Sequence, residues 1–114
     1  MSNRIEKVNS LLEQEISKII LRDFYFPEVL VTLTRVDSFA NLIGAKVYIS
    51  VFPDKDIDKI VDILNKGAYS IQQKINKILK MRPVPKIEFV KDKELIKANK
   101  VQELLNSIKQ EESN

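Results

Sequence analysis

The spacing between apolar residues changes along this chain of 114 residues, and these changes constrain the fold more than any short motif does. In residues 3–22 apolar side chains recur every three or four positions, which predicts an amphipathic helix. Residues 29–37 are rich in β-branched side chains and favour a strand. In residues 45–52 apolar and polar side chains alternate, which indicates a second strand. We expect these two strands to form an antiparallel pair, because only the loop 38–44 joins them.

A long helical pattern follows over residues 54–81, and one glycine interrupts it. Gly67 lies between two apolar stripes, and glycine inside a helix costs about 1 kcal/mol relative to alanine. We therefore expect a kink, or a junction of two helices, at Gly67 and Ala68. The first stripe consists of Ile57, Ile60, Val61 and Leu64, and the second of Ile71, Ile75, Ile78 and Leu79.

The last third of the chain predicts one more strand and one more helix. Two prolines end the long helical pattern, and residues 86–91 then alternate as a third strand. Asp92 can cap a final helix that extends to about residue 109, and residues 110–114 are expected to be disordered. No linker divides the chain, so residues 1–109 should form one α/β domain, an α+β two-layer sandwich.

The residue types that are missing exclude several functions. Without cysteine or histidine, the chain has no disulfide, no thiolate metal site and not the commonest general base. Its two glycines, Gly44 and Gly67, are too far apart for a phosphate-binding loop, and Asp54, Asp56 and Asp58 fit a helix dipole better than a metal site. No apolar run reaches the ~20 residues that span a bilayer, and no signal peptide is recognisable. We expect a cytoplasmic protein that is not an enzyme and has no cofactor, catalytic residue or membrane partner.

Positive charge is concentrated in one part of the chain. Residues 66–100 hold ten basic and three acidic side chains, whereas residues 1–65 hold eight basic and ten acidic ones. Between Lys66 and Lys86 there are six basic residues and no acid. A one-sided field of this kind attracts polyanions, above all nucleic acid. A solvated basic helix face is the alternative interpretation.

A helix would give this charge a shape. At 100° per residue, positions 69, 73, 77 and 80 form one ridge with positions 70 and 74 beside it, while Ile71, Ile75 and Ile78 face the core. Cationic tips, an amide and an aromatic ring on an outward ridge suit a phosphate backbone with an occasional stacked base. The predicted RNA-binding residues are Lys66, Tyr69, Gln73, Lys74, Lys77, Lys80, Arg82 and Lys86.

The predicted order of elements, with a glycine at the helix junction, resembles the type II K-homology fold. Short segments of the chain also resemble, in the correct order, the bacterial ribosome-binding factor A family. The most specific of these is residues 82–92, Arg-Pro-Val-Pro-Lys-Ile-Glu-Phe-Val-Lys-Asp. The other segments are residues 4–8, 15–17, 31–36 and 45–50, and the similarity extends over about residues 4–105.

This resemblance implies an assembly factor for the small ribosomal subunit. Members of the family bind the immature particle, assist late processing and folding of its ribosomal RNA, notably in the cold, and are not enzymes. The resemblance thus implies a monomer without a small-molecule substrate, whose partners are the small subunit and its ribosomal RNA. In the family, a helix kink with an Ala-x-Gly pattern replaces the G-x-x-G loop of ordinary K-homology domains. Here the stretch reads Gly67-Ala68-Tyr69, and Gln72 stands where an arginine is common.

Two other functions are open at this point. A general K-homology module that binds single-stranded RNA or DNA would share the fold, although Ser70 stands where ordinary clamping loops carry their second glycine. A protein-interaction module whose lysines serve only solubility would share the charge. Binding to naked oligonucleotides would support the first alternative, and salt-insensitive binding to a protein partner would support the second.

Overall fold

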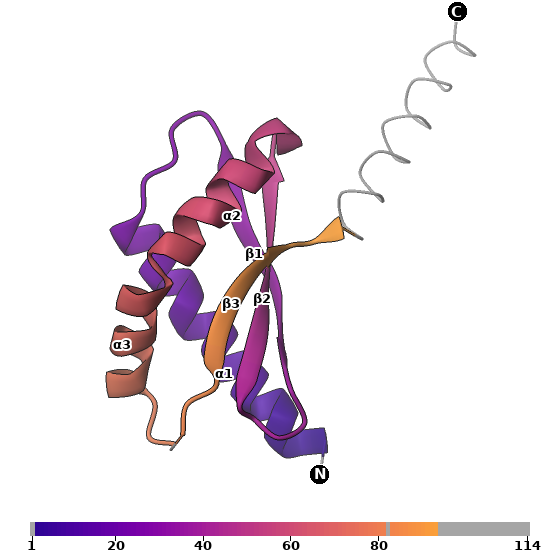
Figure 1. Cartoon of the computed structure of the whole chain (residues 1–114), viewed down its shortest axis with the longest axis vertical. Coiled ribbons are helices and arrows are strands. Elements are labelled where there is room, and N and C mark those ends of the chain that lie inside the picture. The colour runs from indigo at the N-terminus through magenta and orange to yellow at the C-terminus, as the bar shows by residue number, and fades with distance from the viewer. Residues whose placement is uncertain (1, 82, 94–114) are drawn as a thin grey trace, which may run out of the picture.

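The computed structural model describes residues 2–81 and 83–93 (Figure 1). Their order of helices and strands confirms the α+β fold and the type II K-homology-like succession expected from the sequence. The expected C-terminal helix, the expected disordered tail and Arg82 lie outside the described residues. The elements are α1 (Ser2–Asp23), β1 (Leu30–Ser38), β2 (Gly44–Phe52), the short 3-10 turn η1 (Asp54–Asp56), α2 (Ile57–Lys66), α3 (Ala68–Ile78) and β3 (Lys86–Lys91).

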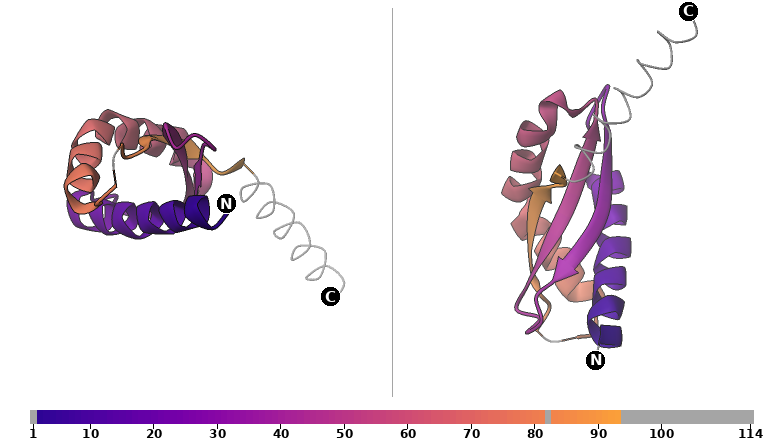
Figure 2. Two further views of the ribbon diagram at one scale, coloured as in Figure 1. Left: turned by 90° about the horizontal axis from the view of Figure 1, so that it is seen from below. Right: turned by 90° about the vertical axis from the view of Figure 1, so that its right-hand side faces the viewer.

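The sheet has three strands, with β2 in the centre. β1 pairs with β2 in the antiparallel direction, as the sequence predicts, and β3 pairs with β2 in the parallel direction. The helices pack against one face of this sheet and leave the other face open (Figure 2). Consequently, Val47 and Ile49 of β2 are buried under the helices, while the neighbouring Lys46 is exposed.

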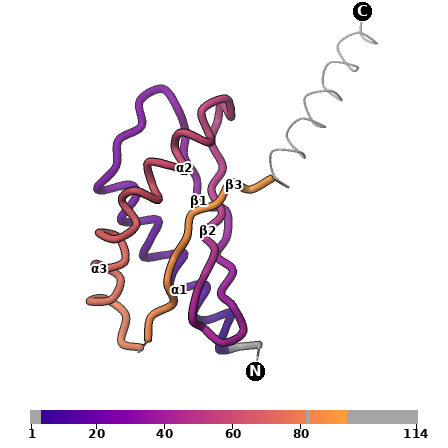
Figure 3. The backbone as a smooth tube through the Cα atoms, viewed as in Figure 1, coloured from indigo at the N-terminus to yellow at the C-terminus, as the bar shows by residue number. Residues whose placement is uncertain are grey.

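One hydrophobic core lies between the helices and the sheet. Leu12 and Ile16 of α1, Leu64 of α2 and Phe89 of β3 are almost completely buried in it. Burial of a side chain of this size contributes about 1.5–3 kcal/mol. The trace of the backbone shows how β3 runs beside α2 and α3 on its way along the core (Figure 3).

A bulge in β1 ties this strand to the end of β3. The register of β1 against β2 shifts between Leu33 and Arg35, so Thr34 has no partner residue across the strand pair. The Thr34 hydroxyl instead donates a hydrogen bond of 2.7 Å to the Asp92 carboxylate, which is buried. This hydrogen bond joins the bulge to the residue that follows β3, and the helix that Asp92 is expected to cap lies outside the described residues.

The expected kink at Gly67 is present, and an aromatic ring explains the glycine. Gly67 separates α2 from α3 and has φ −89°, a value that any residue can adopt. A Cβ atom at this position would lie 2.9 Å from the ring of Phe24, which follows α1 in the chain. Glycine is therefore needed for the close approach of Phe24 and not for its backbone angles.

The long helical pattern ends earlier than the sequence predicts. α3 stops at Ile78 instead of residue 81, and Leu79 adopts an extended backbone with ψ 135°. This turn of the backbone directs Leu79 into the core, where it is buried, and leaves Ile78 47% exposed. The prediction that Ile78 faces the core is wrong for this reason, and Lys80 follows the helix instead of continuing its ridge.

Candidate nucleic-acid interface

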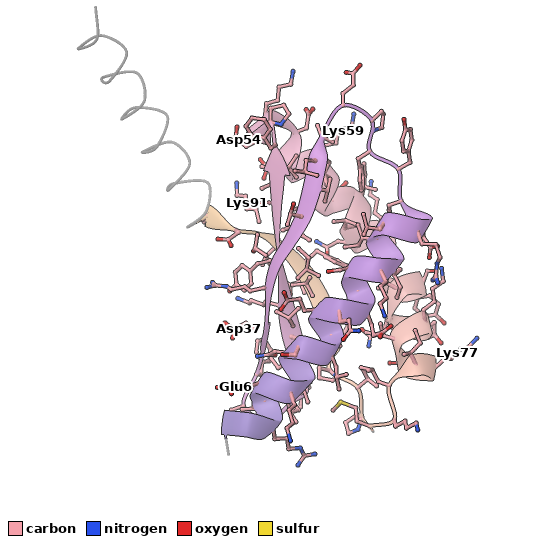
Figure 4. All side chains as sticks on the ribbon, turned by 180° about the vertical axis from the view of Figure 1, so that it is seen from behind. Glu6, Asp37, Asp54, Lys59, Lys77 and Lys91 are labelled. Carbon is pink, nitrogen blue, oxygen red and sulfur yellow. The ribbon has the colours of Figure 1, made fainter. Side chains whose placement is uncertain are left out.

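The outer face of α3 carries part of the predicted ridge. Tyr69, Gln73 and Lys77 are exposed on it, while Ile71 and Ile75 are buried on the opposite side. Lys77 projects away from the body of the molecule near the C-terminal end of α3 (Figure 4). The helix period therefore separates the core residues from the polar ones along α3 as far as Lys77, whereas the apolar Ile78 at its end is exposed.

Two of the predicted site lysines form ion pairs within the protein. Lys74 reaches across to the end of α1 and pairs with the Asp23 carboxylate. Hydrogen bonds from Arg22 and from Lys74 lower the pKa of the Asp23 carboxyl group to about 2. Lys66, in the last turn of α2, lies 3.1 Å from the Asp62 carboxylate one helical turn earlier. Both pairs reduce the charge that these two lysines offer to a partner.

Three other lysines surround the connection between α3 and β3. Lys77 lies near the end of α3, Lys80 in the connection and Lys86 at the start of β3, and all three are exposed. Within residues 2–81 and 83–93, none of the three forms an ion pair. We call Lys77, Lys80 and Lys86 the lysine cluster. It is the part of the predicted site where positive charge is least compensated.

Two carboxamide side chains fasten β3 to the helices beside this cluster. The amide of Asn65 in α2 donates to the Phe89 carbonyl and accepts from the Phe89 N–H, both at 2.8 Å. Gln72 in α3 accepts from the Ile87 N–H at 2.9 Å and donates to the Pro85 carbonyl at 3.1 Å. Both residues thus engage backbone groups at Pro85, Ile87 and Phe89 that a further strand would use.

Sequence reasoning did not select Asn65 for any role and treated Gln72 only as a departure from a family pattern. The two amides lie seven residues apart, on either side of the Gly67 junction. Seven residues correspond to nearly two helical turns, so this spacing could have placed both amides on one face. It could not have shown that the face borders a strand edge, because that depends on the packing of β3.

The open face of the sheet carries a second polar surface. The guanidinium of Arg35 lies 4.1 Å from the centre of the Tyr48 ring, in cation–π geometry. A cavity of about 550 Å³ beside this pair is also lined by Lys46, Val90 and Lys91. Lys91 pairs with Asp58 at 3.1 Å, so the charges of this surface are mixed. The lysine cluster remains the stronger candidate for a polyanion.

Among residues 2–81 and 83–93, no three acidic side chains come together in a way that could hold a metal ion. No helix in this part of the chain combines the length and the apolar character needed to cross a membrane.

Comparisons with known proteins give a consistent result. The family model "Ribosome-binding factor A" matches residues 4–105. A protein of that name from Bdellovibrio bacteriovorus is 36% identical over 110 residues, which cover 95% of this chain and 82% of the relative. Ribosome-binding factor A from Chlamydia caviae is 31% identical over 117 residues, which cover 99% and 98% of the two chains.

Solved structures agree on the fold. The crystal structure of ribosome-binding factor A from Thermus thermophilus superimposes with a TM-score of 0.64 at 19% identity, covering 76% of this chain and 94% of that one. A Thermus thermophilus homology model fitted into a cryo-EM map of a 30S–RbfA complex has a TM-score of 0.61 at 18% identity, covering 72% and 88%. With a family model that spans most of the sequence, this chain belongs to the ribosome-binding factor A family.

Proposed function

We propose that this protein binds the immature small ribosomal subunit through the lysine cluster and assists late maturation of its ribosomal RNA. The observation that carries the proposal is the exposed and uncompensated charge of Lys77, Lys80 and Lys86, in a chain that belongs to this family. A Thermus thermophilus relative of the same fold has been fitted into a map of a 30S complex, which supports the small subunit as the partner.

Counterion release would supply most of the affinity. Each phosphate that a lysine neutralises releases condensed cations. The logarithm of the binding constant therefore falls linearly with the logarithm of the salt concentration. The lysine cluster and one further basic residue of the predicted site would engage about four phosphates. Lys66 and Lys74 would contribute less than the cluster, because Asp62 and Asp23 already neutralise them.

The shape of the interface would supply specificity. The Phe24 ring against Gly67 fixes the junction of α2 and α3, so the outer face of α3 is presented at one angle. Asn65 and Gln72 occupy the backbone groups of β3 at Ile87 and Phe89, which a base edge could otherwise reach. Recognition would therefore use phosphate positions and RNA shape in preference to base identity.

This arrangement favours the ribosomal role over a module that reads the sequence of single-stranded nucleic acid. Such a module must reach base edges, whereas here the backbone of β3 is engaged by side chains. We propose a binding factor that acts as a monomer in the cytoplasm, where its partner assembles, and performs no catalysis. We propose that the protein also assists maturation of the ribosomal RNA at low temperature.

Sedimentation through a density gradient tests the proposal. Wild-type protein in a cell extract should travel with free small subunits and not with translating ribosomes. The triple variant K77E/K80E/K86E should remain at the top of the gradient while keeping the circular dichroism spectrum of the wild type. The control K7E/K55E/K59E changes the charge by the same amount at three exposed lysines elsewhere and should still sediment with small subunits. Retention of subunit binding by the first variant would refute the role of the cluster.

A further inference from the structure

The two edges of the sheet differ in how their backbone groups are used. In β3 the residues whose N–H groups point away from β2 include Ile87 and Phe89, and both are engaged by Gln72 and Asn65. In β1 the N–H groups of four residues point away from β2, namely Val31, Leu33, Val36 and Ser38. N–H groups alternate between the two sides of a strand, and the bulge at Thr34 shifts this alternation by one residue. The outer edge of β1 is therefore the second edge of the sheet.

In the part of the chain that the structure describes, most of this second edge has no hydrogen-bond partner. The Ser38 N–H donates to the Asn9 side chain of α1 at 2.9 Å. Within residues 2–81 and 83–93, no hydrogen bond engages the outward N–H of Val31 or of Leu33. Residues 30–34 also contain no charged residue and no proline, the features that usually protect an exposed edge.

A groove accompanies the unpartnered edge. Ile20 and Leu21 of α1 and Val31 and Leu33 of β1 line a depression of about 150 Å³ at this position. The Leu21 side chain is 81% exposed, and Leu30 at the start of the strand is 67% exposed. Apolar side chains of an added strand would cover these residues, because every second side chain of that strand faces the same side.

The adjacent flank of α1 is acidic. Residues 6, 9, 13, 17 and 20 follow steps of three and four and form this flank, which includes two glutamates and no basic residue. Glu13 lines a depression that shares Ser17 with the groove at the edge. Glu6 lies one turn before Asn9, at the same end of the molecule as Asp37 of β1 (Figure 4).

We propose that the outer edge of β1 at Val31–Leu33 binds an extended, basic segment of a partner protein as an added strand. The alternation of N–H and C=O groups along the edge matches a polypeptide and not a nucleic acid. The charge of Glu6 and Glu13 selects lysine or arginine among the partner side chains that face α1 beyond the groove, next to the apolar ones that cover it. A second copy of this chain is disfavoured, since it would bring the same two glutamates against the first pair.

A defined peptide tests this proposal without the ribosome, so it does not depend on the proposed function. The probe is an eight-residue peptide with blocked ends, added to the isotope-labelled full chain. The alternate positions meant to face α1 carry two valines followed by two lysines, and the other four positions carry threonine. We expect the amide resonances of Val31 and Leu33 to shift and their hydrogen exchange to slow. A matched peptide with glutamate in place of both lysines should cause neither change. Shifts that map to α3 or to the open sheet face instead would overturn the proposal.

Two variants separate the charge from the backbone. E6K/E13K should weaken binding of the basic peptide about tenfold, while D54K/E88K, with the same change in net charge at exposed acids elsewhere, should not. Val31→Pro removes one outward N–H without touching the pairing with β2 and should abolish the slowed exchange at this edge. Equal weakening by both double variants would contradict the proposal even if the proline variant does not fold. Self-association of the free chain through Val31–Leu33 would contradict it as well.

Discussion

The β1 and β3 edges belong to the same three-stranded sheet, yet they differ in how their backbone groups are engaged and in the charge of the side chains around them. At the β3 edge, carboxamides from α2 and α3 engage the backbone, and the lysine cluster lies beside them. At the β1 edge, the hydrogen bond from Ser38 to Asn9 is the only one from an outward N–H among the described residues, and glutamates of α1 lie nearby. Helix side chains therefore decide whether a strand edge is available, although strand sequence alone is commonly used to judge it.

The largest expected difference between the two sides concerns polyanion binding. Affinity of the wild type for a small-subunit RNA should fall with salt at a log–log slope of about −3, as expected for about four phosphates. K77A/K80A/K86A should reduce the size of this slope by about 2, because three contacts are lost. Titrations at several salt concentrations measure it, and E6A/E13A on the opposite flank is the control. An unchanged slope in the lysine variant would show that RNA binds elsewhere.

The next largest effect concerns the closed edge itself. Asn65→Leu leaves both the N–H and the carbonyl of Phe89 without their partner, so we expect the free energy of unfolding to fall by about 2–3 kcal/mol. Urea denaturation followed by circular dichroism measures this change. Ser70→Ala, an exposed position in α3, should change it by less than about 0.5 kcal/mol. A similarly small loss for Asn65→Leu would mean that water replaces the amide at no cost.

A smaller loss is expected at the other edge. Asn9→Ala removes a single hydrogen bond, the one from the Ser38 N–H, and should lower the free energy of unfolding by about 1 kcal/mol. The same denaturation experiment measures it. The ratio of the two losses is the useful quantity, because it compares one engaged group at β1 with two at β3. A loss at Asn9 equal to that at Asn65 would remove the distinction between the edges.

The smallest effect depends on pH and concerns the link from α1 to α3. The pKa of Asp23 is lowered from 3.8 to about 2 by Arg22 and Lys74, so its carboxylate stabilises the fold. This contribution is complete above about pH 4 and disappears as the pH falls through about 2. Asp23→Asn should flatten the dependence of the denaturation midpoint on pH in this interval. Glu28→Gln, at an exposed position in the connection after α1, should leave it unchanged.

The sequence predicted the elements better than their contacts. Periodicity located α1, both strands of the antiparallel pair, the Gly67 junction and β3, because each depends on residues that are near neighbours in the chain. It extended α3 too far, because an apolar residue at position 79 is compatible both with a helical apolar stripe and with an extended backbone that turns into the core. Position in the helix therefore could not decide between Ile78 and Leu79 as the core residue.

The positive charge of the candidate site could be predicted from the sequence, but the partners of its side chains within the protein could not. The absence of acids between Lys66 and Lys86 is visible in the sequence. The pairing of Lys74 with Asp23 is not, because 51 residues separate them and only the packing of α1 beside α3 brings them together. The hydrogen bonds of Asn65 and Gln72 could not be predicted for the same reason, because their partners are backbone groups in and just before a strand that follows 13 to 24 residues later.

The engagement of β3 by Asn65 and Gln72 also limits how such molecules can assemble. A β-sheet propagates into a filament only if each subunit has two free strand edges, one for each of its two neighbours. Here one side is occupied by the subunit's own side chains. We therefore expect association through strand pairing to stop after a single addition, because two carboxamides compete with any strand that approaches β3.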